Sequence, residues 1–309
     1  MLDVKAPLKP ATTATAALRR RQRKGAAGYL LAAPLGLFLI LAVLIPVASG
    51  VVTAFQSFNL NNPGHPFTGF SNFKAVLADP GFYSAISFTL VFTFGSLIFE
   101  MALGIALALL FDRAFPGKRV FLTLAMFPIM IAPSFMAILW RLSLNSDAGL
   151  FAAMVKKLGL SDNLLGSSTA IPTLIMVDSL HWAPFVMLMV YAGLQTVPQD
   201  LYEAANLDGA GYWKTRFLVV APYVMPTLAI TLFLRLIDGL KTFDTIYILT
   251  GGGPGTETTN INVYVYKLAF TGGDFGAAAA TSLMFLIVLL VLVPLVTRYL
   301  VPGQPRSKA

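Results

Sequence analysis

Two ionisable side chains, Asp178 and His181, lie inside an otherwise charge-free apolar stretch that runs from about Thr169 to Leu194. Residues three apart share one face of a helix, and Trp182 follows directly. The carboxylate accepts hydrogen bonds, the imidazole donates or accepts them, and the indole offers an apolar face. This combination suits a sugar or a similar polyhydroxylated ligand. A hydrogen bond between helices, or a proton relay without ligand contact, is the alternative.

A second group of side chains surrounds the end of a later apolar stretch, and it comprises Arg235, Asp238, Lys241, Phe243 and Asp244. Asp238 and Lys241 are three residues apart, so they share one face of a helix, and Asp244 lies one turn beyond. We expect this face to line a cavity at the mouth of the helix. The alternative is a structural ion pair between Arg235 and Asp238. Arg235 and Lys241 would give such a cavity some preference for an anion.

The composition around these charges excludes an ordinary soluble domain. Of the 309 residues, 57% are hydrophobic and only 12% are charged, and the mean hydropathy is +0.75. A soluble domain has about 25% charged residues, and this chain lacks the polar side chains that would cover a globule of its size. We therefore expect the chain to be embedded in a lipid bilayer.

A charge at membrane depth is expensive, at about 2.5–3.5 kcal/mol on insertion scales, so it usually faces a cavity or a partner group. This cost is the reason for assigning roles to the ionisable residues above. Glu100 is the only charged residue between Tyr83 and Phe111. We expect it to make a polar contact between helices, with contact to a ligand as the alternative.

Apolar stretches of about 20 residues predict membrane-spanning helices, because that length crosses the hydrocarbon core. The first stretch is longer than the core of a signal peptide, so we expect an uncleaved helix. The sequence thus predicts an all-α polytopic membrane protein with about six transmembrane helices. They are expected at about Tyr29–Phe55, Tyr83–Phe111, Val120–Trp140, Thr169–Leu194, Tyr223–Thr242 and Phe275–Thr297.

The Lys and Arg residues predict the orientation of these helices, since cytoplasmic loops carry an excess of them. Both termini and the even-numbered connections hold 15 of the 22, seven of them before Gly25. We therefore expect a basic cytoplasmic tail over 1–28, a transmembrane domain over 29–300 and a cytoplasmic tail over 301–309. The net charge of +8 is explained by this anchoring, and no nucleic-acid motif accompanies it.

The cytoplasmic connection over about 195–222 is longer than a membrane hairpin needs. Pro198 is suited to open a helix whose first turn holds Asp200, and Asp208-Gly209 permits a tight turn because glycine accepts a positive φ. A second helix is expected from about Tyr212 to Val220. This pattern predicts a projecting helix–turn–helix element that docks on a partner. An interfacial hairpin lying among the lipid headgroups is the alternative.

Three segments of the sequence resemble the permeases of carbohydrate ABC importers of the maltose type. The run EAANLDGA over Glu203–Ala210, with Phe217, Pro222 and Pro226 downstream, resembles the EAA loop of that family. The segments RLIDGLKTFDTIYILTGGGPG over Arg235–Gly255 and FGAAAATS over Phe275–Ser282 are similar to the family as well. The similarity covers nearly everything after Tyr29.

The resemblance implies a division of labour among several chains in a bacterial inner membrane. A second, homologous permease completes the path, two ATPase subunits bind ATP and magnesium, and an extracytoplasmic binding protein delivers a small carbohydrate. This chain would then hold no cofactor and hydrolyse no ATP, in line with the lack of a phosphate-binding loop at Gly117-Lys118. The implied contacts with the ATPase are Glu203, Ala204, Ala205, Asp208, Gly209, Ala210, Phe217 and Pro222.

Two other classes of protein are considered beside this one. A stand-alone, proton-driven secondary transporter would use Asp178 and His181 as its relay, but no inverted repeat is evident. A membrane enzyme would need a nucleophile elbow or a cluster with metal-ligand spacing, and the sequence has neither. Cysteine is absent, which excludes disulfides and thiolate metal sites. We therefore expect no catalytic and no metal-binding residues.

Overall fold

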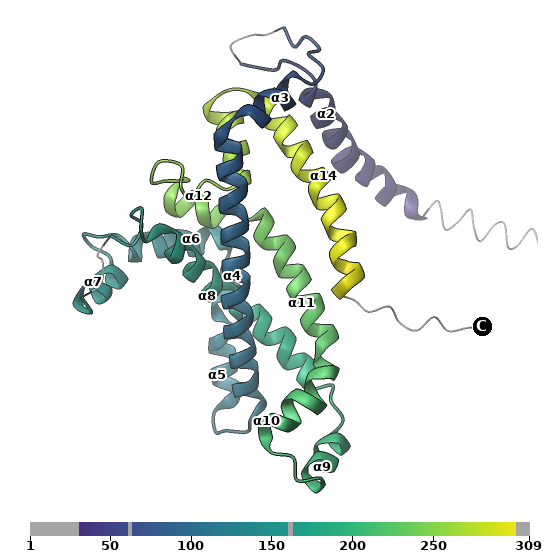
Figure 1. Ribbon diagram of the computed structural model, residues 1–309, viewed down its shortest axis with the longest axis vertical. Helices are drawn as coiled ribbons and strands as arrows, with labels where there is room; N and C mark the ends of the chain where they lie inside the picture. Colours follow the sequence, from purple (N-terminus) through teal and green to yellow (C-terminus); the bar gives the residue numbers. More distant parts are fainter. Residues whose placement is uncertain (1–30, 61–63, 160–162, 301–309) are drawn as a thin grey trace, which may run out of the picture. The chain divides into compact units, whose positions relative to one another are not determined.

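The computed structural model describes residues 31–60, 64–159 and 163–300, and these ranges are organised mainly as helices (Figure 1). The expected tails over 1–28 and 301–309 lie outside the described residues. The chain divides into two compact units, one up to Thr53 and one from Ala54 onward. The second unit contains every side chain discussed below.

Five helices in the described ranges are long and apolar enough to cross a membrane, which confirms five of the six expected spans. They are Leu31–Ala54, α4 (Pro80–Asp112), α8 (Ala170–Leu194), Tyr212–Lys241 and α14 (Phe275–Leu300). The first contains a π-helical turn (Ile40–Leu44) and α2 (Ile45–Ala54). The fourth consists of α10 (Tyr212–Thr215), a π-helical turn (Arg216–Val220) and α11 (Ala221–Lys241).

The remaining expected span, over 120–140, is broken into shorter pieces. It consists of α5 (Lys118–Ala125), a 3-10 turn (Phe127–Met130) and α6 (Pro133–Ser143). Pro128 and Pro133 cannot donate a backbone hydrogen bond, and Pro133 forces the preceding residue into an extended conformation. Ala132 accordingly has φ −59° and ψ 138°. Hydropathy alone does not detect this break, because one or two prolines hardly change the mean hydropathy of an apolar stretch.

The helices α4, α8 and α11 form the centre of the second unit, with α8 packed along α4 and α11 against both (Figure 1). Gly104 on α4 allows the close approach of α8. A Cβ atom at this position would lie 2.5 Å from Cβ of Val186. Small residues serve this purpose in membrane helices, where close packing replaces the hydrophobic effect.

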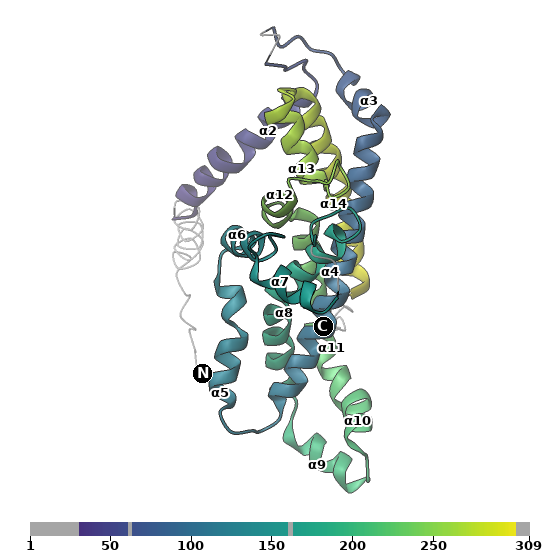
Figure 2. The ribbon, with the colours of Figure 1, turned by 90° about the vertical axis from the view of Figure 1, so that its left-hand side faces the viewer.

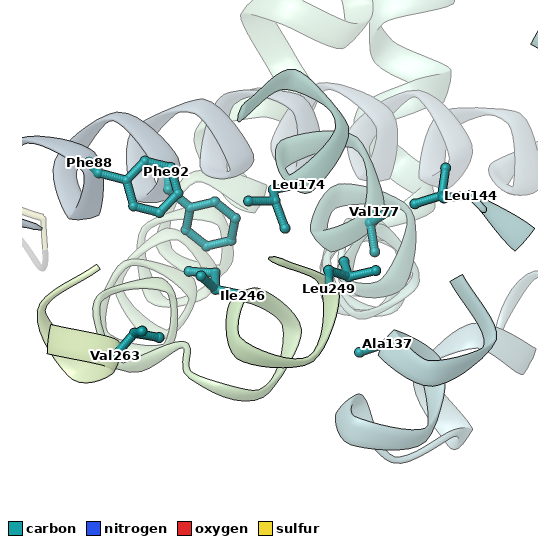
Figure 3. Close-up of a cluster of buried hydrophobic side chains, with 9 residues drawn as sticks. All are labelled: Phe88, Phe92, Ala137, Leu144, Leu174, Val177, Ile246, Leu249 and Val263. Atoms are coloured by element: carbon teal, nitrogen blue, oxygen red, sulfur yellow. The ribbon is translucent and has the colours of Figure 1, made fainter. Parts of the chain in front are cut away.

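The expected outer loops contain short helices. They are α3 (Ser71–Ala78), α7 (Leu150–Lys157), α12 (Asp244–Thr250), α13 (Ile261–Tyr266) and a following π-helical turn (Lys267–Thr271). A cluster of buried apolar side chains holds α12 against α4 and α8 (Figure 3). Phe92, Leu174 and Ile246 are fully buried there. This core fixes the position of Asp244 at the start of α12.

The helix α9 (Gln199–Leu207) and α10 lie at the opposite end of the same unit from α12 and α13 (Figures 1 and 2). The expected second helix does not stop before Pro222 but continues into α11. The π-helical turn explains this, since it shifts the hydrogen bonds by one residue just before the proline. The N–H of Ala221 thereby bonds to the carbonyl of Arg216.

Candidate functional site

A buried arginine stands at the centre of the polar side chains between α4, α8 and α11. Arg235 donates two hydrogen bonds to Glu100, from Nε to Oε2 at 2.7 Å and from Nη2 to Oε1 at 2.8 Å. It also pairs with Asp238 at 2.5 Å, and Nη2 lies 3.5 Å from Oδ2 of Asp178. Its guanidinium lies over the Trp182 ring, 4.2 Å from the centroid. We call Glu100, Asp178, Arg235 and Asp238 the arginine cluster.

This geometry assigns structural contacts to Glu100 and Arg235, for which the sequence had left two roles open. Glu100 makes the expected polar contact between helices, and Arg235 forms the ion pair with Asp238. The Arg235 side chain is 3% exposed and that of Glu100 1%, while that of Asp238 is 43% exposed. The first pair therefore links the helices inside the unit, and Asp238 extends the cluster to an accessible surface.

A pocket of about 160 Å³ lies beside the arginine cluster. Six of the seven residues expected along a substrate path line it: Asp178, Trp182, Asp238, Lys241, Phe243 and Asp244. Pro133, Thr242 and Thr245 complete the wall. Of these three, Thr242 and Thr245 are neighbours of the expected residues in the sequence. Pro133 lies in the broken segment over 118–143, and nothing in the sequence indicated that it would line this pocket.

His181 is the expected path residue that the pocket does not include. It lines a separate pocket of about 260 Å³, together with Trp140, Leu180 and other residues around α6. His181 is buried, and its Nδ1 atom has no hydrogen-bond partner among the described residues. Asp178 and His181 thus share a helix but line different pockets.

The element over 198–220 has the helix–turn–helix form that the sequence predicts. Pro198 precedes α9, Asp200 lies in its first turn, and Gly209 has φ +70°. Gly209 donates its N–H to the carbonyl of Asn206, and Ala210 donates to that of Ala205. These two bonds form a Schellman motif, in which a left-handed glycine ends the helix.

Most of the residues expected to meet an ATPase are exposed in this element. Glu203, Ala204, Asp208 and Gly209 are exposed on α9 and its turn, whereas Ala205 is buried. Phe217 is 68% exposed and stacks on Trp213, and Leu207 is 89% exposed. Ala210 is half-buried, and Pro222 is exposed near the start of α11. The element therefore presents a small, mixed polar and apolar surface.

A second arginine ties this element to the end of α4. Arg216 pairs with Asp112, the last residue of α4, and its Nη1 donates to the hydroxyl of Tyr202 at 3.3 Å. Its guanidinium lies 5.6 Å from the ring centroid of Tyr202 and 5.2 Å from that of Tyr212. Burial raises the pKa of the Tyr202 phenol above its ordinary value. We call Asp112, Tyr202, Tyr212 and Arg216 the loop clasp.

The loop clasp is the group that sequence reasoning missed. Asp112 and Arg216 are 104 residues apart, and each by itself is an ordinary charge at the end of an apolar stretch. No spacing rule connects them. Within the described ranges, no group of three or more His, Asp or Glu side chains has the arrangement of a metal site.

Comparisons with known proteins agree with this architecture. Residues 100–304 match the model of the family described as binding-protein-dependent transport system inner membrane component. The chain is 34% identical to the trehalose/maltose transport system permease protein of Thermococcus litoralis, over 89% of this chain and 93% of the relative. It is 31% identical to the trehalose transport system permease protein of Mycobacterium tuberculosis, over 88% and 89%.

A solved structure shares the fold. It belongs to a bacterial ABC transporter involved in the import of the acidic polysaccharide alginate, and one of its chains aligns with a TM-score of 0.81 at 24% identity. The alignment covers 93% of this chain and 99% of that one.

Proposed function

This chain belongs to the family of binding-protein-dependent transport system inner membrane components, and we propose how it works as the permease subunit of an ABC importer for a sugar or sugar derivative. It is a multi-pass protein of the inner membrane. The proposal concerns the two ends of its second unit: the helix–turn–helix element around Gly209 couples to ATP hydrolysis, and the pocket beside Arg235 lies on the substrate path.

The observation that carries the proposal is a single helix joining the two ends. The helix Tyr212–Lys241 has 30 residues, which corresponds to a length of about 45 Å. Arg216 of the loop clasp lies near its start, and Asp238 and Lys241 of the pocket lie near its end. A displacement of α9 and its turn is therefore transmitted along one continuous helix to the wall of the pocket.

The ATPase contact is assigned to the exposed surface of α9 and its turn. Glu203 forms a salt bridge or a cap with the ATPase, and Gly209 provides the bend that holds α9 in place. The ATP and its magnesium are bound by the ATPase chains. Closure of an ATPase pair draws the loops together, and the helices rock between inward- and outward-facing arrangements as rigid bodies.

The assembly comprises two ATPase subunits, a second homologous permease and an extracytoplasmic binding protein. The Lys and Arg excess on the side of α9 supports a cytoplasmic position for this element and for both termini. Relatives named as trehalose or maltose permeases support a small carbohydrate as the substrate. A proton-driven mechanism finds no support in the geometry, because Asp178 and His181 line different pockets.

The substitution Gly209→Val tests the coupling role. Valine in the left-handed region costs about 1–2 kcal/mol or more, so the turn is expected to rearrange. We expect the complex to reach the membrane, while substrate uptake falls at least ten-fold and ATP hydrolysis is no longer stimulated by the loaded binding protein. The measurements are uptake and ATPase activity of the importer in proteoliposomes.

Gly211→Val is the matched control, because Gly211 has an ordinary φ of −67° and a Cβ there would meet nothing within 4 Å. It is expected to retain most of the uptake. Normal uptake by Gly209→Val would remove the turn from the mechanism.

A further inference from the structure

We propose that the pocket beside Arg235 selects hydroxyl-rich ligands that are neutral or cationic, and that it rejects saccharides carrying a carboxylate, sulfonate or phosphate. This inference rests on the proposed function, since it concerns the ligand class of the substrate path. It reverses the preference for anions that Arg235 and Lys241 indicate in the sequence.

The first argument is that three of the five N–H donors of Arg235 already bond to carboxylates of the protein, which leaves little capacity for an anionic ligand. Its Nε and Nη2 atoms donate to Glu100, and Nη1 donates to Asp238. One face of the guanidinium is covered by Trp182. An arginine recognises carboxylate or phosphate groups through its planar fork of donors, and both edges of this fork already meet protein carboxylates.

The second argument is the balance of charge around the pocket. Asp238 and Asp244 line it as carboxylates that are partly accessible, whereas Lys241 is the lining cation. Behind the wall, Arg235 forms an ion pair with Glu100. Negative groups thus outnumber the cation along the accessible wall, and a negative field of this kind repels anions most strongly where the dielectric constant is low.

Two other cations at this end of the unit are directed to backbone or hydroxyl oxygens. Arg141 donates to the carbonyl of Ile248 at 3.0 Å, and Lys267 donates to the hydroxyl of Thr259 at 3.2 Å. Neither residue lines the pocket.

The third argument is that a carboxyl oxygen in the pocket wall lacks a hydrogen-bond donor from the protein. Asp178 is 1% exposed, and its Oδ2 atom has no hydrogen-bond partner among the described residues. The hydroxyl of Thr242 is directed to the carbonyl of Asp238 at 3.3 Å. The carboxyl groups of Asp178, Asp238 and Asp244 thus give the wall several acceptors beside the donors of Lys241, Trp182 and Thr245. Sugar hydroxyls and ammonium groups donate to acceptors, whereas ionised carboxylate, sulfonate and phosphate groups only accept.

Saturation-transfer NMR on the purified importer, without its binding protein, tests the inference with a matched pair of probes. Methyl α-glucoside and methyl α-glucuronide share the ring and differ at one carbon, where the glucuronide carries a carboxylate. We expect saturation transfer to the glucoside and binding of the glucuronide that is at least ten-fold weaker, as expected for charge exclusion by a focused field. Equal or tighter binding of the glucuronide would overturn the inference.

The double substitution Asp238→Asn with Asp244→Asn removes two negative charges from the wall. We expect this double variant to reduce the ratio of the affinities for the glucoside and the glucuronide by roughly ten-fold or more. Glu257→Gln is the control, because Glu257 is an exposed carboxylate of the same connection that does not line the pocket. An unchanged ratio in the double variant would assign the discrimination to another part of the importer and overturn the role of this pocket.

The outcomes separate this inference from the function on which it rests. Glucuronide binding as tight as that of the glucoside, in an importer that couples normally, would overturn the inference alone. A chain that purifies without an ATPase would overturn the proposed function, and the inference with it. Binding of neither probe to an importer that transports a saccharide would overturn the inference that the pocket accepts neutral, hydroxyl-rich ligands, and would leave the proposed function standing.

Discussion

Arg235 and Arg216 lie on the same continuous helix, and each pairs with a carboxylate of α4, but their surroundings differ. Arg235 and Glu100 are 3% and 1% exposed, and two further carboxylates approach the same guanidinium. Arg216 and Asp112 are each 13% exposed, and their other contacts are the rings of Tyr202 and Tyr212. The helix is thus attached to α4 at two points of unequal strength.

The difference indicates two uses of the same chemistry. A fully buried ion pair is tightly constrained, because separating its members exposes each charge to a low dielectric. A pair near the surface can open and close at little cost, since water replaces the lost partner. The arginine cluster is suited to keep α4, α8 and α11 together through the transport cycle, and the loop clasp is suited to a joint that moves.

The largest expected effect follows from Arg235→Met, which removes the cation of the arginine cluster. Glu100 is left as a buried charge without its partner, which destabilises the fold by about 3–5 kcal/mol. Arg235→Lys is expected to recover only part of this loss, because lysine lacks the planar fork. Thermal denaturation of the purified complex, followed by size-exclusion chromatography, measures both. A melting temperature close to that of the wild type would place the stability of the three-helix contact elsewhere.

The matched substitutions Glu100→Gln and Asp112→Asn compare the two attachment points directly, because each neutralises one carboxylate of α4. Glu100→Gln is expected to lower the free energy of unfolding by about 1–3 kcal/mol, since Arg235 loses a buried, charge-assisted contact but keeps two carboxylates. Asp112→Asn is expected to lower it by about 1 kcal/mol or less.

Asp112→Asn is expected to affect transport more than stability, in contrast to Glu100→Gln. The ratio of ATP hydrolysed to substrate imported, measured in proteoliposomes, is expected to rise in Asp112→Asn because α9 is less firmly joined to α4. Equal effects of the two substitutions on stability would contradict the distinction between the arginine cluster and the loop clasp.

The smallest expected effect is that of Tyr202→Phe, which removes one hydroxyl from the loop clasp and keeps the ring. The hydrogen bond from Arg216 is lost, which corresponds to about 0.5–1.5 kcal/mol, while the cation–π contact remains. We expect a small decrease in melting temperature and a modest loss of coupling. A loss of coupling as large as that of Asp112→Asn would show that the hydroxyl, and not the ion pair, holds the loop.

Hydropathy and turn propensity correctly predicted the elements that depend only on neighbouring residues. Apolar stretches of sufficient length became helices, and Gly209 adopted the left-handed conformation that ends α9. The broken segment over 118–143 was missed because a hydropathy pattern reports burial in lipid and not the hydrogen bonds that Pro128 and Pro133 cannot make. The position of His181 was also beyond local rules, since neighbours on one helix face can border different cavities.

The sequence by itself determined that the chain spans a membrane repeatedly, because too few polar residues exist to cover a soluble surface, and it identified the helix–turn–helix element from its turn chemistry. Only the tertiary structure decided that Glu100 meets Arg235 and that Asp112 meets Arg216. These partners lie 135 and 104 residues away in the chain, and a charge in a sequence does not specify its partner. Ion pairs depend on which helices pack together, and that packing is a property of the whole fold.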